Sequence, residues 1–159
     1  MEGIGRVKVY SHPDLFKNSY SISGGNKRLI GIPLRREILE NRGAEFIFNT
    51  NFKEIVPDLI FSGEIPREIP FEKGDKNQVL KTKEGYIKDP ILDDQTLFIS
   101  TKKGLIIILG CSHAGMINII NYAIEKTGQE HIDTIIGRTH LGPASEEVRE
   151  KKYPSFKKI

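Results

Sequence analysis

Two segments of this chain run from an apolar stretch into the same ending, Gly-x-x-His. The first reads IIILGCSH over residues 106–113 and the second reads DTIIGRTH over residues 133–140, so His113 and His140 occupy equivalent positions. A neutral imidazole nitrogen binds metal ions near neutral pH, and two such ligands are a start on a zinc or iron site. A catalytic zinc needs about three protein ligands. The alternative is that both are loop histidines that bind backbone carbonyl groups.

The elements around these histidines predict that they face one crevice. Residues 105–109 are apolar throughout, which predicts a central strand covered on both faces. Residues 114–127 have helical spacing and residues 132–137 read as a second strand, so the two strands should be parallel neighbours. The carboxyl ends of such strands hold the ligands of open α/β sheets. The expected helix buries Met116, Ile119, Ile120, Ala123 and Ile124, places Asn118, Asn121 and Glu125 opposite them, and ends at Gly128.

Other chemistry is open to the segment GCSHAG (residues 110–115). A nucleophile elbow requires Gly-x-Ser-x-Gly, and here the second glycine comes one residue late, which argues against Ser112 as a nucleophile. Cys111 could act as a thiolate at a helix N-terminus, or it could pack as a small hydrophobic residue. A glycine turn before a helix could also bind a phosphate group, because the first N–H groups of a helix attract anions.

The rest of the chain reads as one α/β domain over residues 1–159. We expect a strand at 6–10, a helix at 34–43 after Pro33, and two or three short strands within 44–65. A turn-rich loop follows at 66–78, and residues 95–109 read as a hairpin with a Lys-Lys-Gly turn. A last helix is expected at 145–152, with Ser145 as its N-cap.

Composition narrows the class of protein. The chain has 24 basic and 21 acidic residues, and the basic excess lies in the tail 149–159, which we expect to be a frayed terminus. Outside this tail, the basic residues are not distributed in a way that would form a face for binding nucleic acid. No apolar run approaches the about 20 residues of a membrane span. A single cysteine and the absence of a signal-like segment favour the cytoplasm.

The segment from LDDQTLFIS to IIGRTHL (residues 92–141) resembles the second half of metal-dependent hydrolases with the metallo-β-lactamase fold. The segments VYSHPDLFKNSYS, GIPLRREILENRGAEFIF, LIFSGEIPRE and FEKGD are similar, in the same order, to the branch named for the dihydropterin ribofuranosylaminobenzene phosphate synthase. The resemblance implies part of an αββα sandwich, with a mixed sheet and covering helices. It also implies a site of two metals, commonly zinc, with His113 and His140 among the ligands.

The His-x-His-x-Asp-His motif that supplies the other ligands in this family is absent from the chain, and so are the family's strands and helix after the Gly-x-x-His-Leu segment. Arg138 stands where the family often has a second glycine. Three explanations fit these departures: a truncated remnant, half of a split enzyme completed by an N-terminal-half chain, or a homo-oligomer that pairs its open sheet edge.

The resemblance places His12 and Arg67 in loops near the substrate pocket, where Arg67 would suit the phosphate of a small anionic substrate. Glu64 is a third candidate on the same grounds. Asp93 and Asp94 could orient a metal-binding imidazole. Ordinary turn and surface roles are the alternative for all five residues.

The function implied is a metal-dependent hydrolase or transferase in which a metal-activated water attacks a phosphate, ester-like or pterin-related substrate. We expect this activity to be incomplete in the chain alone. The alternative is a catalytically inactive remnant or an interaction subunit.

Overall fold

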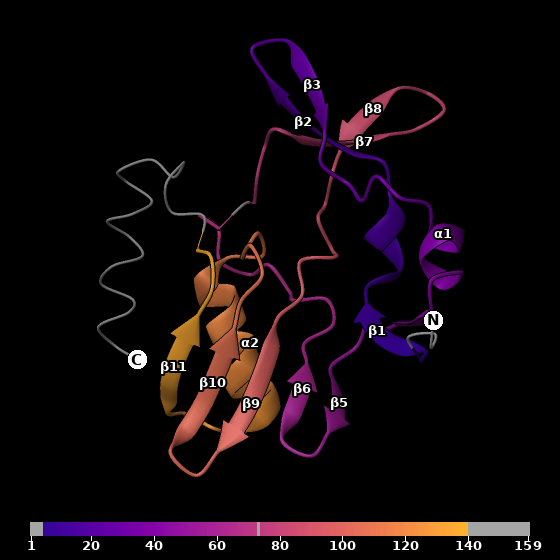
Figure 1. The fold of residues 1–159 in the computed structure, drawn as a ribbon. Coiled ribbons are helices and arrows are strands. Elements are labelled where there is room, and N and C mark those ends of the chain that lie inside the picture. Colours follow the sequence, from indigo (N-terminus) through magenta and orange to yellow (C-terminus); the bar gives the residue numbers. More distant parts are fainter. Residues whose placement is uncertain (1–4, 73, 140–159) are drawn as a thin grey trace. The chain divides into compact units, whose positions relative to one another are not determined.

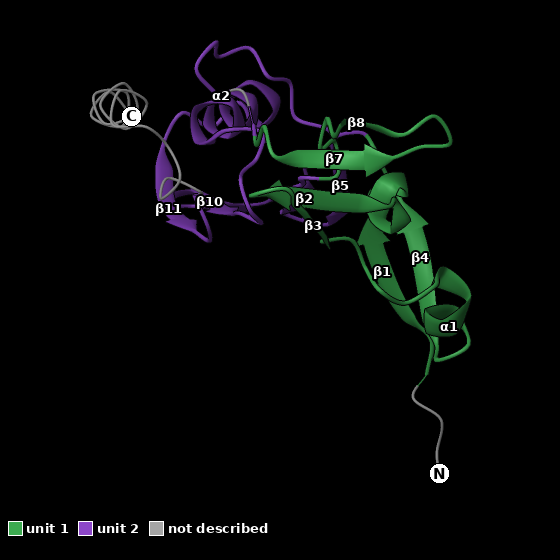
Figure 2. Cartoon of the chain, turned by 90° about the horizontal axis from the view of Figure 1, so that it is seen from above, with its two compact units in different colours: residues 1–50, 75–93 green, residues 51–74, 94–159 purple. Residues whose placement is uncertain are grey.

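The computed structural model describes residues 5–72 and 74–139, and these fall into two compact units (Figure 2). Unit 1 comprises residues 1–50 and 75–93, and unit 2 comprises residues 51–74 and 94–159. His140, the helix expected at 145–152 and the tail 149–159 lie outside the described residues. The single domain expected over 1–159 stays a prediction.

Unit 2 is built on a five-stranded mixed sheet (Figure 1). The strand order is β11-β10-β9-β6-β5, and every pair is antiparallel except β10 and β11. The helix α2 (Met116–Thr127) joins these two parallel strands, which confirms the strand–helix–strand unit predicted around the two histidine motifs. The strands are β5 (Lys53–Val56), β6 (Leu59–Phe61), β9 (Leu97–Thr101), β10 (Gly104–Ile108) and β11 (Ile132–Ile136).

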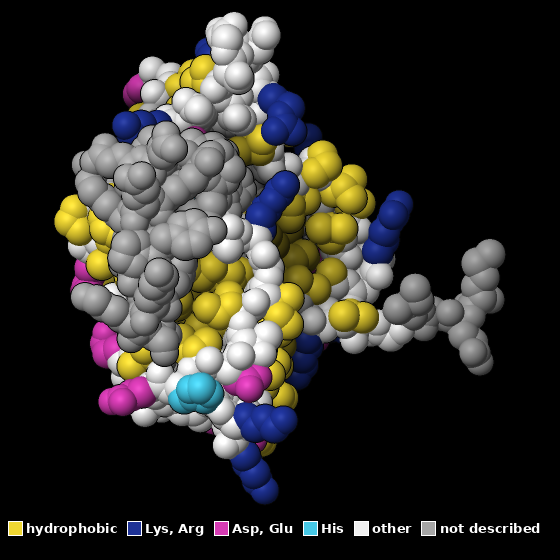
Figure 3. All heavy atoms as spheres, turned by 90° about the vertical axis from the view of Figure 1, so that its left-hand side faces the viewer, with side chains coloured by type: hydrophobic (Ala, Val, Ile, Leu, Met, Phe, Trp, Pro, Cys, Tyr) yellow, Lys and Arg dark blue, Asp and Glu magenta, His cyan; other side chains and the backbone are white. Residues whose placement is uncertain are grey.

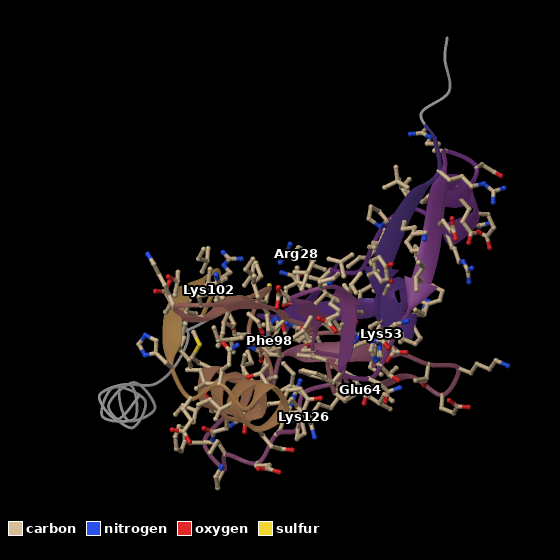
Figure 4. The ribbon with its side chains drawn as sticks, turned by 90° about the horizontal axis from the view of Figure 1, so that it is seen from below. Arg28, Lys53, Glu64, Phe98, Lys102 and Lys126 are labelled. Atoms are coloured by element: carbon tan, nitrogen blue, oxygen red, sulfur yellow. The ribbon has the colours of Figure 1, made fainter. Side chains whose placement is uncertain are left out.

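The core of unit 2 lies between the sheet and α2, and Figure 4 shows Phe98 in this layer. Leu105 and Ile107 of β10 are fully buried, whereas the alternate residues Ile106 and Ile108 are only partly covered. The expectation of a strand covered on both faces is therefore met on one face only within the described residues. Each fully buried large side chain contributes about 1.5–3 kcal/mol of transfer free energy. The helix supplies Met116, Ile119, Ile120 and Ala123 to this core.

The predicted bounds of α2 are close to the observed ones, but one polar residue was misplaced. Gly128 ends the helix in the left-handed conformation, as expected. Asn118 was expected on the exposed face with Asn121, yet it is only 3% exposed. The prediction for Asn118 was wrong because polarity alone assigned it to solvent, whereas its side chain is hydrogen-bonded to neighbouring backbone, as described below.

Within residues 5–50 and 75–93, unit 1 contains two small sheets and two short helices. One sheet is a parallel pair, and the other is antiparallel with the order β3-β2-β7-β8. The helix expected at 34–43 is shorter than predicted. The parallel pair is β1 (Val7–Ser11) with β4 (Ala44–Phe48), the antiparallel strands are β2 (Ser19–Ser23), β3 (Asn26–Leu29), β7 (Gln78–Lys81) and β8 (Tyr86–Lys88), and the helices are η1 (Pro13–Phe16) and α1 (Arg36–Glu40).

The buried side chains among the described residues of unit 1 are mainly polar, and one of them, Asp89, is 1% exposed. Its carboxylate accepts hydrogen bonds from Ser19 Oγ at 2.5 Å, from Lys17 Nζ at 2.9 Å and from the Ile91 amide at 2.8 Å. Burial by itself raises the pKa of Asp89, but these hydrogen bonds and the charge of Lys17 together hold the pKa below its usual value. Asp89 also holds Ile91, whose φ of 51° is unusual for a β-branched residue.

Within residues 5–72 and 74–139, no helix combines the length and the apolar character needed to cross a membrane.

Candidate functional site

The loop that carries His113 leaves the carboxyl end of β10 and is held against the segment that follows β11. Ser112 Oγ donates to the Arg138 carbonyl oxygen at 2.5 Å, and the Arg138 amide donates to the Gly110 carbonyl oxygen at 3.3 Å. Ser112 is buried and has a φ of 60°, an uncommon conformation for a residue with a side chain. The loop after β10 and the loop after β11 are therefore joined directly.

Gly137 lets these two loops approach closely. Its φ is +132°, and a Cβ atom there would lie 2.4 Å from the Leu109 carbonyl oxygen, closer than real side chains allow. The position of Gly137 beside the end of β10 agrees with the prediction that both Gly-x-x-His motifs open at one end of the sheet. His140 follows this junction by three residues but lies outside the described residues, so its position beside His113 stays a prediction.

Asp94 supports the loop of His113 from the segment that precedes the neighbouring strand β9. It precedes β9, which runs antiparallel to β10, so it lies at the sheet end where His113 begins its loop. The Oδ2 atom of Asp94 accepts a hydrogen bond from the Ala114 amide at 2.7 Å, and both residues are buried. Asp94 therefore fixes the backbone immediately after His113, which is a more specific contact than its sequence position predicts.

Arg67 is the second predicted residue that the structure brings near this loop. Its Nη1 atom lies 2.8 Å from the place where a Cβ of Gly74 would stand, and the same place is 3.3 Å from the His113 carbonyl oxygen. Gly74 thus leaves room for the guanidinium group beside the His113 backbone. Glu64 lies on the same segment 62–72 and is half-buried; Figure 4 marks its place.

Asn118 and Glu72 anchor this segment to the start of α2, and sequence reasoning missed both. Asn118 Oδ1 accepts from the Glu68 and Ile69 amides, each at 3.0 Å, and its Nδ2 donates to the Ala114 carbonyl oxygen at 2.8 Å. The signal that could have identified Asn118 is its position within one turn of the histidine loop, combined with the affinity of amide side chains for turn backbone.

Glu72 occupies the N-terminus of α2. Its carboxylate is 4% exposed and accepts from the Asn118 amide at 2.9 Å and the Ile117 amide at 3.2 Å. A carboxylate is favourable here because the helix dipole is positive at this end. Gly115 makes the approach possible, since a Cβ there would lie 2.2 Å from Glu72 Oε2. These two amides, considered above as a phosphate site, are therefore bound by the chain's own carboxylate.

His12 and Asp93 lie in unit 1 and have other partners there. His12 is buried, and its Nδ1 accepts from the Asp14 amide at 3.0 Å, which caps η1. Asp93 forms an ion pair with Lys17, which also binds Asp89. The His12 contact is of the turn type given above as the alternative, whereas the ion pair of Asp93 joins residues 76 positions apart in the chain.

The two nucleophile candidates have different surroundings. The Ser112 hydroxyl donates its proton to a backbone carbonyl, and this contact agrees with the argument against a serine nucleophile. Cys111 is a free, half-buried cysteine.

Of the two histidines predicted to bind metal, only His113 lies within the described residues. The imidazole of His113 is a suitable donor, but no three His, Cys, Asp or Glu residues within 5–72 and 74–139 are grouped closely enough to hold an ion. Whether His113 and His140 share a metal ion therefore stays a prediction.

A solved structure described as a metal-dependent hydrolase of the β-lactamase superfamily matches 98% of this chain with a TM-score of 0.80 and 22% sequence identity. This chain has the metallo-β-lactamase fold. The predicted α/β class and its mixed sheet are thereby confirmed, and the match extends over 57% of the solved chain.

Two curated proteins are similar to this chain in sequence. A 7,8-dihydropterin-6-methyl-4-(β-D-ribofuranosyl)-aminobenzene-5'-phosphate synthase of Methanocaldococcus jannaschii is 29% identical over 96% of this chain and 53% of the relative. An uncharacterised protein of the same organism is 32% identical over 94% of this chain and 54% of the relative. No family model matches the sequence. The resemblance to the synthase branch is confirmed, and the chain spans about half the length of the curated relatives it matches.

Proposed function

We propose that this chain is part of a metal-dependent enzyme with the metallo-β-lactamase fold that acts on a small phosphate-bearing, ester-like or pterin-related substrate. The observation that carries the proposal is the junction of the two Gly-x-x-His loops, where Ser112 binds Arg138 and Arg138 binds Gly110. The substrate class is supported by the name of the synthase relative and the metal by the description of the solved hydrolase.

In this proposal His113 and His140 are metal ligands, and zinc is the metal we expect. A bound zinc ion lowers the pKa of a coordinated water and stabilises negative charge that develops on a phosphate or ester oxygen. The chain's own residues position the ligands: Asp94 and Ser112 hold the backbone on either side of His113. Arg67, beside the His113 backbone, supplies a cation suited to a phosphate group.

The proposed site is incomplete in this chain, and the remaining ligands would come from a complementary polypeptide or from another copy of the chain. The second candidate function is a catalytically inactive remnant or an interaction subunit that keeps the fold.

Zinc affinity separates these functions. The purified chain and the variants His113→Ala, His140→Ala and His131→Ala are titrated with zinc in competition with a chromophoric chelator. His131 is an exposed histidine at the start of β11, the opposite end of that strand from His140, and serves as the matched control. We expect the first two variants to lose more than about tenfold in zinc affinity and His131→Ala to retain it. Equal affinity in all four proteins would contradict the proposal.

A further inference from the structure

The antiparallel sheet of unit 1 carries charge of one sign. Its four strands, in the order β3-β2-β7-β8, contain four basic residues and no acidic residue. The protein as a whole has mixed signs, with 24 basic and 21 acidic residues, and Figure 3 shows side chains of both charges on one face of the molecule. The single sign is therefore a property of this sheet. Its basic residues are Lys27, Arg28, Lys81 and Lys88.

Three of these lysines surround Tyr86 on one face of the sheet, although their strands are far apart in the chain. Cross-strand partners and alternate residues of a strand share a face. The register pairs Lys81 with Tyr86, and Lys88 lies two residues further along β8. Lys27 reaches the same ring from β3, with its Nζ atom 4.0 Å from the ring centroid. All three lysines are exposed, and neither Lys81 nor Lys88 forms an ion pair with any residue of 5–72 and 74–139.

Contacts across the sheet hold β8 in place. The Tyr86 ring packs edge-on against the ring of Tyr20 on β2, with the two centroids 5.7 Å apart. Tyr86 is nevertheless 39% exposed, and Ile87 on the opposite face is 53% exposed. Both faces of β8 therefore offer accessible side chains on an ordered strand, and an ordered surface loses less conformational entropy on binding than a disordered one.

The backbone of β8 is also placed for binding, because β8 stands at the end of the strand order in its sheet. The Asp89 amide donates to the Gln78 carbonyl oxygen at 2.9 Å, so it points toward β7. Successive amides of a strand point to opposite edges, and those of Tyr86 and Lys88 therefore point away from β7. A strand added at this edge places every second side chain on the face that holds the lysines.

We propose that the outer edge of β8 binds an extended acidic segment of another protein as an additional strand. Backbone hydrogen bonds to Tyr86 and Lys88 supply part of the affinity, and the three lysines favour a strand whose alternate residues are Asp or Glu. Lysine on an edge strand also discourages pairing between copies of the same edge, so a second copy of this chain is a poorer partner. The inference goes beyond the proposed function, because it involves no metal and no residue of the candidate site.

Single-stranded nucleic acid is the other polyanion to consider. Its phosphates could approach the lysines, but it has no row of alternating N–H and C=O groups to pair with a strand edge. The outward amides of β8 therefore favour the acidic peptide.

The test uses the full chain and a fluorescein-labelled peptide in which glutamate alternates with threonine. Fluorescence anisotropy measures binding, and hydrogen exchange measures protection of the Tyr86 and Lys88 amides. A peptide with lysine in place of glutamate and a labelled single-stranded oligonucleotide are the comparison ligands. Lys81→Glu and Lys88→Glu reverse charge on the proposed surface. Lys53→Glu is the matched control, because Lys53 is an exposed lysine on β5, the edge strand of the sheet in unit 2 (Figure 4).

We expect saturable binding of the acidic peptide with protection of both outward amides. Combining Lys81→Glu with Lys88→Glu should weaken binding at least about tenfold, while Lys53→Glu should change it by less than about twofold. Added salt should weaken the complex, because exposed charges are screened. No binding of the acidic peptide, equal binding of the lysine peptide, an equal effect of Lys53→Glu, or tighter binding of the oligonucleotide would overturn the proposal.

Discussion

Asp94 shows how one side chain can define the position of a loop. Its carboxylate binds the amide of Ala114, the residue that follows His113, from the segment that precedes β9, the strand adjacent to β10 in the sheet. Both groups are buried, so the hydrogen bond is shielded from water. This hydrogen bond fixes the backbone that follows His113.

Replacing Asp94 tests this role. Asp94→Ala should lower the free energy of unfolding by about 1–3 kcal/mol, because the buried Ala114 amide loses its acceptor. Asp94→Asn should lose less, since the amide oxygen of asparagine can still accept from Ala114. Urea denaturation followed by circular dichroism measures both changes. An Asp94→Ala protein within about 0.5 kcal/mol of the unmodified chain would contradict this role.

Residue types and spacing identified part of the candidate site. The Gly-x-x-His pattern correctly indicated that the loops at Gly110 and Gly137 meet, because parallel strands end at the same sheet edge. The same reasoning could not separate Asp93 from Asp94, which are neighbours in the chain but bind Lys17 and Ala114 respectively. Which partner an acidic side chain finds depends on long-range packing that a local pattern does not contain.

At the scale of elements, α2 and the segment 62–72 form one structural piece. Asn118 binds the backbone of Glu68 and Ile69 on that segment and the Ala114 carbonyl oxygen on the histidine loop. The side chain therefore links three parts of the chain through a single buried amide.

Two asparagines on α2 provide a matched pair for measuring this link. Asn118→Ala should lower the free energy of unfolding by about 1–3 kcal/mol, because two backbone amides and one carbonyl lose their partner. Asn121→Ala on the exposed face should change it by no more than about 0.5 kcal/mol. Chemical denaturation of both variants tests the difference. Similar effects at the two positions would show that Asn118 does not anchor the segment.

Periodicity predicted the elements better than it predicted their contacts. The strands within 44–65, the hairpin of β9 and β10, and the helix α2 all follow from apolar spacing and turn residues. Glu72 lies in a predicted loop without periodicity, so nothing local indicated that it would cap α2. The α1 helix is shorter than its pattern suggested.

At the scale of the whole molecule, the two units should differ in stability. Unit 2 has a contiguous apolar core, whereas the buried residues of unit 1 are mainly polar. Local opening costs least where few apolar contacts are lost.

Native-state hydrogen exchange of the isolated chain checks this difference. After correction for intrinsic rates, we expect the amides of β10 and α2 to exchange at least about tenfold more slowly than those of β1 and β4. Equal protection in the two units would mean that unit 1 is stabilised by contacts other than a buried apolar core.

The carboxylate of Glu72 at the start of α2 has a consequence for binding experiments. A free anion that approaches the Ile117 and Asn118 amides must compete with a group tethered to the same chain. Tethering gives that group an effective concentration in the millimolar range or above. Buffer phosphate or sulfate at ordinary concentrations should therefore leave these amides bound to Glu72. Any anion affinity measured on this protein should instead come from cationic side chains, Arg67 among them.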